Sequence, residues 1–246
     1  MLAGQKSYGN NGYQNFLFPL EIMWMTQGSY SHTYSHNGCY AMDFQGAQYD
    51  GNGNVERRYH CPYYAPFDCT CVKIWGSSSP MAVWQSDNPV NAIGYNLPIV
   101  CCIGFCHDNN INSIHVGDHK MQGDVIGHTG TYGAPGADHV HIEATLGPYN
   151  GYYQNSSNVW MLRDSTWLYN LMGVNDTDLY KDYYVNHQGT TVHYNWREFS
   201  DIGPTPPGPE PPEPEPRDKT KGFPWWLYWN KFRNDRQWLS FFLFVI

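Results

Sequence analysis

The stretch HVHIEATL, residues 139–146, alternates polar and apolar side chains as a strand with two unlike faces would. Successive residues of a strand point to opposite faces of the sheet. Val140 and Ile142 are therefore expected on one face, and His139 and His141 on the other. Two imidazoles on one face can bind one metal ion together, or one can bind the ion while the other acts beside it. The competing interpretation is a solvent-facing strand that carries its histidines by chance.

The segments that precede this stretch predict an all-β domain. Between residues 31 and 146, short apolar runs alternate with clusters of Gly, Asn, Asp and Pro, and no amphipathic helix is apparent. The clearest apolar runs are YAMDF (40–44), CTCVKIW (69–75), LPIVCCIGF (97–105) and GDVIGHTG (123–130).

Charge and composition exclude some functions and favour others. At 246 residues, the chain can hold one sizeable domain with appendages, or two small domains. Its net charge of −8 argues against a nucleic-acid-binding protein, whose contact surface would be basic. Charged residues are only 15% of the chain and aromatic residues 17%, which favours a strand-rich domain of extracellular type. The 11 histidines are many beside 14 Lys plus Arg, and histidine is the commonest metal ligand.

Composition also divides the chain into segments. The stretch PTPPGPEPPEPEPRD is predicted to be an extended, semi-rigid linker, because proline favours polyproline II and the acidic residues repel one another. The basic, aromatic tail after it ends in WLSFFLFVI, far short of the roughly 20 apolar residues that span a bilayer. This tail could contact a membrane surface, a virion component or another partner. The predicted segments are an N-terminal segment packed on the core (1–30), the core (31–146), a β or loop extension of the core (147–203), the linker (204–218) and the tail (219–246).

The seven cysteines show neither a zinc-binding pattern nor a disulfide framework. Their number is odd, two of them are adjacent, and no pair has the C-x-x-C spacing. We therefore expect buried, reduced thiols, with a link from Cys61 to Cys69 or Cys71 left open. The N-terminus lacks the basic and apolar regions of a secretory signal peptide, so an extracellular substrate would require another route of delivery.

Two upstream stretches offer further side chains for a metal or catalytic site. SHNGCYAMDF (35–44) contains His36 and, seven residues later, Asp43 between apolar neighbours. A carboxylate in such a setting is costly to bury unless it is paired or bound to a metal, and the alternative is an edge-strand Asp that faces solvent. GFCHDNN (104–110) places His107 where an apolar run ends in a polar loop, from which it could reach over a groove.

Together these stretches resemble the lysostaphin-type zinc metallopeptidases, which cleave peptide bonds in peptidoglycan. The resemblance covers roughly residues 30–146, and the family's motifs occur in the family's order. The matching segments are SHNGCYAMDF, the strand YYAPFDCTCVKIW (63–75), His107, the glycine-rich run IHVGDHKMQGDVIGHTGTYG (114–133) and the H-x-H of DHVHIE. The resemblance implies an all-β, lysostaphin-type fold in which an antiparallel sheet carries a substrate groove.

The same resemblance implies a role for each matching side chain. His36, Asp43 and His141 become the ligands of one Zn²⁺ ion, and two imidazoles with one carboxylate suit zinc with a fourth position open. His139, the first histidine of the H-x-H, becomes catalytic, and His107 becomes its partner. Either of these two could act on the proton of the attacking water.

The chain departs from the family pattern in one spacing. Six residues separate His36 from Asp43, where the family usually has three. This longer turn resembles that of members found among phage lysins and tail proteins, and it leaves His32 as a rival first ligand. Glu143 shares the H-x-H face, but the family gives it no fixed role, so it is expected to be structural. Of the other histidines, His128 is the one expected to line the groove.

The implied activity is hydrolysis of a peptide bond in bacterial peptidoglycan, either in the stem peptide or in the cross-bridge. No paired-carboxylate signature of a glycosidase stands out. The spacing variant, the linker and the lack of a visible signal peptide favour a phage protein, either a lysin released at lysis or a component of the virion tail. The alternative is a non-catalytic wall-binding or phage tail structural module with a degenerate peptidase fold.

Overall fold

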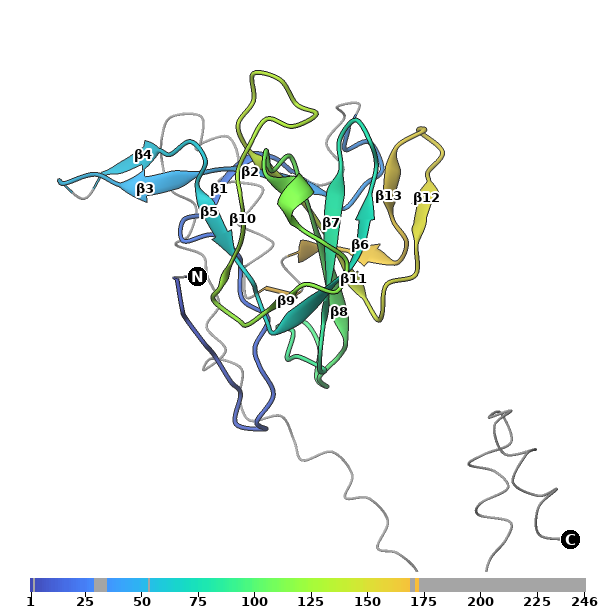
Figure 1. The fold of residues 1–246 in the computed structure, drawn as a ribbon. Coiled ribbons are helices and arrows are strands. Elements are labelled where there is room, and N and C mark those ends of the chain that lie inside the picture. The colour runs from blue at the N-terminus through green and yellow to red at the C-terminus, as the bar shows by residue number, and fades with distance from the viewer. Residues whose placement is uncertain (2, 29–34, 53, 169–170, 173–246) are drawn as a thin grey trace, which may run out of the picture. The chain divides into compact units, whose positions relative to one another are not determined.

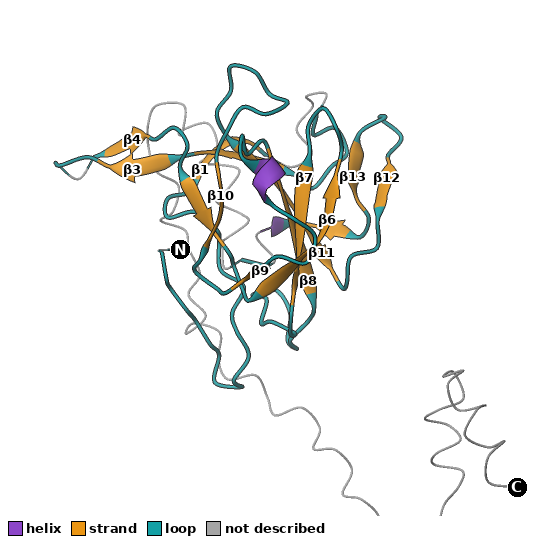
Figure 2. Cartoon of the chain, viewed as in Figure 1, coloured by secondary structure: helices purple, strands orange, loops and turns teal. Residues whose placement is uncertain are grey.

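Antiparallel strands make up almost all of the regular structure (Figures 1 and 2). The computed structural model describes residues 1, 3–28, 35–52, 54–168 and 171–172. Its strands are β1 (Trp24–Gln27), β2 (Met42–Gln45), β3 (Ala47–Tyr49), β4 (Val55–Arg57), β5 (Pro62–Tyr64), β6 (Cys69–Trp75), β7 (Met81–Ser86), β8 (Cys101–Cys106), β9 (His119–Lys120), β10 (Val125–His128), β11 (Val140–Leu146), β12 (Tyr152–Gln154), β13 (Trp160–Leu162) and β14 (Ser165–Thr166). A 3₁₀ helix, η1 (Ile111–Ser113), follows β8, and the described residues contain no α-helix. The predicted all-β fold is confirmed.

The largest sheet has the H-x-H strand near its middle. It is eight-stranded, in the order β1-β2-β11-β8-β7-β6-β9, with β14 paired to β11 as well. All of its strand pairs are antiparallel, as predicted. The remaining strands form the two-stranded sheets β10-β5, β12-β13 and β3-β4. The β3–β4 hairpin continues directly from β2 and projects beyond the sheet (Figure 1).

The last part of the run LPIVCCIGF, CCIGF (101–105), is apolar because both faces of β8 are buried. Ile103 and Phe105 belong to the main hydrophobic core. Cys102 and Cys106 point to the opposite face, where they pack with Leu162 of β13 in a second apolar cluster. A strand buried on both faces has no polar alternation, so a continuous apolar run is what its position requires. This central strand is therefore firmly held, and it ends immediately before His107.

The segment before β1 contributes aromatic rings to the main core. Phe16 packs edge-on against Phe67 with ring centroids 4.7 Å apart, and Phe18 packs against Phe44 at 4.9 Å. Fully burying a phenylalanine side chain stabilises a fold by roughly 1.5–3 kcal/mol. Because Phe44 follows Asp43 in β2, this packing also holds the strand that carries the candidate carboxylate ligand.

All seven cysteines are free and buried. The expectation of buried, reduced thiols is thereby confirmed, and the link from Cys61 to Cys69 or Cys71 is not formed. Burial raises the pKa of the thiols, for example that of Cys71 to about 11. The thiols therefore remain protonated at neutral pH and act as small apolar side chains in the core.

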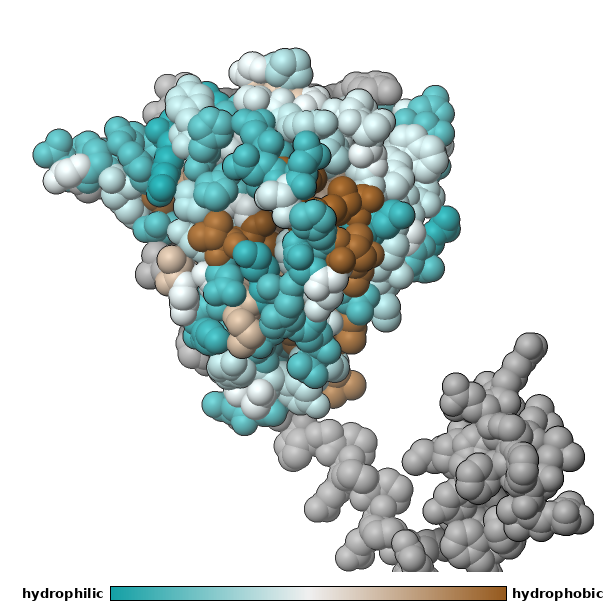
Figure 3. Space-filling model, in the orientation of Figure 1, coloured by the Kyte–Doolittle hydropathy of each residue, from teal (hydrophilic) through white to brown (hydrophobic). Residues whose placement is uncertain are grey.

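The described surface is mainly polar. Figure 3 shows a hydrophilic face with separate hydrophobic patches. Among the described residues, no helix is long and apolar enough to cross a membrane. The linker (204–218), the tail (219–246), part of the predicted extension and His32 lie outside the described residues.

Candidate metal centre

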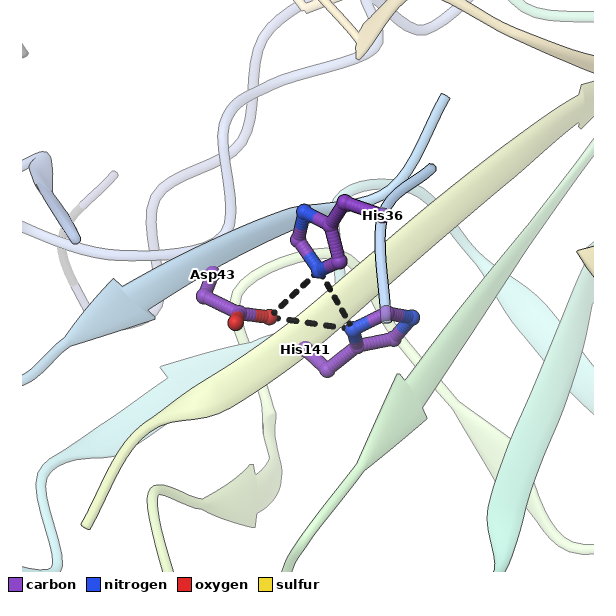
Figure 4. Close-up of side chains that lie close together, drawn as sticks. All are labelled: His36, Asp43 and His141. Atoms are coloured by element: carbon purple, nitrogen blue, oxygen red, sulfur yellow. Dashed lines mark hydrogen bonds and ion pairs between the residues drawn. The ribbon is translucent and has the colours of Figure 1, made fainter. Parts of the chain in front are cut away.

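The three predicted ligands come together from one turn and two paired strands (Figure 4). Asp43 of β2 lies directly opposite His141 of β11 in the antiparallel ladder. His36 comes from a turn before β2 and is fully buried. Gly38 ends this turn with a φ of 72°, a left-handed conformation that glycine adopts without strain. The turn takes up the extra residues of the long spacing and still brings His36 to the strand pair.

The ligand atoms form a nearly equilateral triangle. Oδ1 of Asp43 lies 3.2 Å from Nε2 of His36 and 3.0 Å from Nδ1 of His141. The two ring nitrogens are 3.2 Å apart. In a tetrahedral zinc site with bonds of about 2.0–2.1 Å, two ligand atoms are separated by about 3.3 Å. The triangle is therefore close to the size that one zinc ion requires.

Hydrogen bonds on the outer side of each ring set the tautomers. Nδ1 of His36 lies 3.0 Å from the Gly28 carbonyl oxygen, which can only accept, so this nitrogen carries the proton. Nε2 of His141 lies 3.3 Å from a carboxylate oxygen of Glu143, which also accepts. In the neutral rings, Nε2 of His36 and Nδ1 of His141 thus present lone pairs to Asp43. Three lone pairs that face one another require a cation between them.

The electrostatics of the triangle agree with this requirement. Burial opposes the ionisation of Asp43, but hydrogen bonds with His141 and His36 hold its pKa well below the usual range. Burial likewise opposes protonation of His141, yet Asp43 and Glu143 outweigh it and raise the pKa of His141 to about 10. The pocket therefore favours positive charge at this point, supplied either by a proton or by a metal ion.

Both predicted catalytic histidines lie beside the triangle. His107 follows Cys106, which pairs with His141 across β8 and β11. The ring centroids of His107 and His139 are 4.4 Å apart, and Nε2 of His139 lies 3.7 Å from Oδ2 of Asp43. The structure therefore brings together all five side chains that the sequence selects, from positions more than 100 residues apart.

Main-chain carbonyls hold the two catalytic candidates in one tautomer. Nδ1 of His107 donates to the carbonyl of Tyr132 at 2.7 Å, and Nδ1 of His139 donates to that of Ala137 at 2.6 Å. In the neutral form of each ring the lone pair is therefore on Nε2. His107 also has a φ of 77°, a strained left-handed conformation for a residue with a side chain, and such strain is often found at functional sites.

In the glycine-rich run before the H-x-H, steric crowding explains why position 130 is a glycine. Its amide and carbonyl both pair with the backbone of His139. A Cβ atom on Gly130 would lie 2.3 Å from the carbonyl oxygen of His107, far inside van der Waals contact. Glycine at this position thus lets the loop connect the two catalytic candidates.

The site opens into a pocket of about 600 Å³. Asp43, His141, His107 and His139 line it, together with Ser79 from the loop between β6 and β7. His36 lies beneath these residues and is buried. A ligand in the pocket would therefore reach the open side of the triangle and both catalytic candidates at once.

The ring of His107 should titrate far below an ordinary histidine. Burial, reinforced by the neighbouring rings of His141 and His139, lowers the pKa of His107 to about 4. In the unfolded chain the pKa is about 6.5, whereas in the fold the ring stays neutral down to about pH 4. Because the unfolded chain then binds a proton that the fold does not, His107 lowers the stability of the fold as the pH falls from about 6.5 to 4. Ring NMR resonances followed against pH should give a midpoint near 4 for His107. A midpoint at or above 6.5 would contradict the tautomer and the burial described above.

Glu143, which was expected from the sequence to be structural, contacts one of the three candidate metal ligands. Its side chain is buried, accepts the Leu162 amide at 2.6 Å with one oxygen, and faces Nε2 of His141 with the other. A carboxylate behind a metal-bound histidine orients the ring and raises its basicity. The only indication of this contact in the sequence was the period-2 alternation, which placed Glu143 on the same face as the two histidines of the H-x-H.

Replacing Glu143 with glutamine should weaken zinc binding by about 10- to 100-fold, the usual effect of losing an outer-shell partner. Competition with a chromogenic chelator would measure the affinity, with the exposed Glu56→Gln variant of β4 as control. Equal zinc affinity in both variants would show that Glu143 does not act on the metal site.

One minor prediction about the groove is wrong. His128 is not among the residues that line the pocket; it ends β10, which pairs with β5 in a two-stranded sheet. The amide of His128 donates instead to a carboxylate oxygen of Asp108.

A phage protein is similar to most of the chain. No protein-family model matches this chain. Morphogenesis protein 1 of Bacillus phage B103 is 28% identical over 215 residues, which are 87% of this chain and 52% of the phage protein. The chain thus spans about half the length of this curated relative.

Several solved structures have a limited likeness to the chain. LytU is 20% identical, with a TM-score of 0.34, over 52% of this chain and 77% of that one. Lysostaphin from Staphylococcus simulans is 15% identical, with a TM-score of 0.37, over 61% and 51%. A zinc-containing peptidase from Vibrio cholerae is 14% identical, with a TM-score of 0.36, over 64% and 44%. Because these identities and TM-scores are low, the metal site is inferred from the geometry of the three candidate ligands alone.

Proposed function

We propose that the chain is a zinc-dependent endopeptidase that hydrolyses peptide bonds in bacterial peptidoglycan. The observation that carries this proposal is the triangle of His36, Asp43 and His141 beside His107 and His139 in one pocket. Three protein ligands with one open side are typical of catalytic zinc, whereas structural zinc sites use four.

Each residue of the site has a chemical role in this reaction. Zinc held by the triangle would supply Lewis acidity toward a peptide carbonyl and toward water. Nε2 of His107 or His139 would accept the proton of the attacking water, since Nδ1 of each ring donates to a main-chain carbonyl and leaves Nε2 as the acceptor. The same ring could then pass that proton to the leaving amine. Glu143 would hold His141 in the ligating orientation.

Two features support peptidoglycan as the substrate and a phage as the source. The five site residues occur in the order of the lysostaphin-type motifs, and lysostaphin-type enzymes cut wall peptides. The similarity to a phage morphogenesis protein suits a wall-cutting activity carried on a virion tail or released at lysis. In either case the enzyme would act on the wall from outside the host cytoplasm.

Purified peptidoglycan would test the type of bond that is cut. Incubation with the zinc-loaded full chain should release new amino groups and no new reducing sugar ends. New reducing ends would indicate a glycosidase instead. Binding to the wall without either product would favour a non-catalytic wall-binding module.

A further inference from the structure

Arg57 of β4 lines the pocket, and the proposed chemistry gives it no role. It is the only Arg or Lys among the described residues that line the pocket. Arg57 pairs with Ala47 across the β3–β4 hairpin, and β3 begins two residues after the metal-binding strand β2 ends. The hairpin therefore carries a positive charge to one end of the site.

Two neutral groups hold the guanidinium in place. One of its terminal nitrogens donates to the carbonyl oxygen of Asp138 at 3.1 Å. Its central carbon lies 4.5 Å from the centroid of the Tyr59 ring, in a cation–π contact. Asp138 immediately precedes His139, so the guanidinium is anchored next to a catalytic candidate.

Arg57 has no carboxylate within 4.0 Å in the part of the chain that the structure describes. The nearby carboxylate of Asp138 is buried and accepts instead from the Thr129 hydroxyl at 2.7 Å and the His60 amide at 3.3 Å. Asp43, the other acid of the pocket, faces the metal-binding histidines. A guanidinium has five N–H donors, and the contact with Asp138 occupies one nitrogen. Arg57 is therefore held in the pocket with donors left for an anion.

The geometry points to a substrate contact. We propose that Arg57 binds a free carboxylate of the wall peptide and so selects anionic over amidated peptides, an inference that rests on the proposed peptidase function. Asp138, which accepts from Arg57, lies three residues before His141 along the chain, so the recognised carboxylate would bind on the Arg57 side of the same pocket. Arginine suits this role because its planar fork matches a carboxylate with two parallel hydrogen bonds.

A pair of matched substrates tests the proposal. Cross-linked muropeptides would be used in their carboxylate form and after carbodiimide-driven conversion of the carboxylates to carboxamides. The enzymes would be wild type, Arg57→Gln and Arg58→Gln, the last being an exposed neighbour outside the pocket lining. Wild type and Arg58→Gln should cleave the carboxylate form with a kcat/KM about tenfold higher than that for the carboxamide form, the effect expected of a charged hydrogen bond at an exposed site. Arg57→Gln should lose this preference, mainly through a higher KM.

A binding measurement separates this proposal from the peptidase proposal. In the His139→Ala background, calorimetry should show the same preference for the carboxylate form, lost in the Arg57→Gln variant and kept in the Arg58→Gln variant. Failure of wild type to cleave either substrate would contradict the peptidase proposal, while the binding preference would still report on Arg57. If Arg57→Gln lowers cleavage or binding of both forms equally, or changes neither, Arg57 does not bind a carboxylate of the substrate.

Discussion

Replacing Asp43 with alanine should lower the affinity for zinc by on the order of a thousandfold or more. Loss of an outer-shell partner alone typically costs 10- to 100-fold, and Asp43 supplies one of three ligand atoms and the negative charge of the triangle. Nε2 of His36 and Nδ1 of His141 would remain 3.2 Å apart, with no anion between them. Competition with a chelator and metal analysis of the purified chain would measure the loss.

The chain offers a matched control in Asp87→Ala. Asp87 contacts Nε2 of His119 at 2.7 Å in an exposed pair, and no second histidine among the described residues contacts it, so its removal should leave zinc binding unchanged. Wild type should retain about one zinc per chain, as expected for a mononuclear site. Full zinc occupancy in an Asp43→Ala, His141→Ala double variant would mean that the metal binds elsewhere.

Replacing His139 with alanine should reduce turnover by about 10²- to 10⁴-fold, the range associated with losing one proton-transfer group. The variant should keep its zinc, because Nε2 of His139 lies 3.7 Å from Asp43 and outside the triangle of ligand atoms. Amine release from peptidoglycan and zinc content should be measured on the same preparation. His128→Ala, which alters a histidine outside the pocket lining, is the control and should retain activity. Loss of zinc from His139→Ala would make this residue a ligand, and full activity would remove it from the mechanism.

Sequence alternation was sufficient to predict the faces of the central strand. Val140 and Ile142 are fully buried in the main core, and His139 and His141 line the pocket on the other face. The prediction succeeded because β11 lies within the sheet. A shift of its register by one residue would move its apolar side chains from the core face to the pocket face, at a high cost in free energy. Glu143 did not follow the simple alternation of apolar and exposed positions. It is buried because β13 covers that end of the strand and offers the Leu162 amide.

Other features of the site depend on contacts that alternation does not contain. The tautomer of His36 is set by the carbonyl of Gly28, the residue after β1. Arg57 reaches the pocket through a hairpin and contacts a residue 81 positions away in the chain. The glycine-rich run next to the H-x-H does not indicate which strand β10 pairs with, and His128 at the end of β10 is not part of the pocket lining. Such pairings depend on the tertiary arrangement of the sheets.

Zinc titration of the metal-free full chain, with amine release from purified peptidoglycan as the readout, tests the central claim most directly. Activity should be absent before zinc is added, rise in proportion to it and level off at about one zinc per chain, since the site offers one set of three ligands. Chelation should reverse the gain, and the Asp43→Ala variant should show none. Amine release that is equal with and without zinc, or no release at any zinc concentration, would contradict the assignment of this chain as a zinc peptidase.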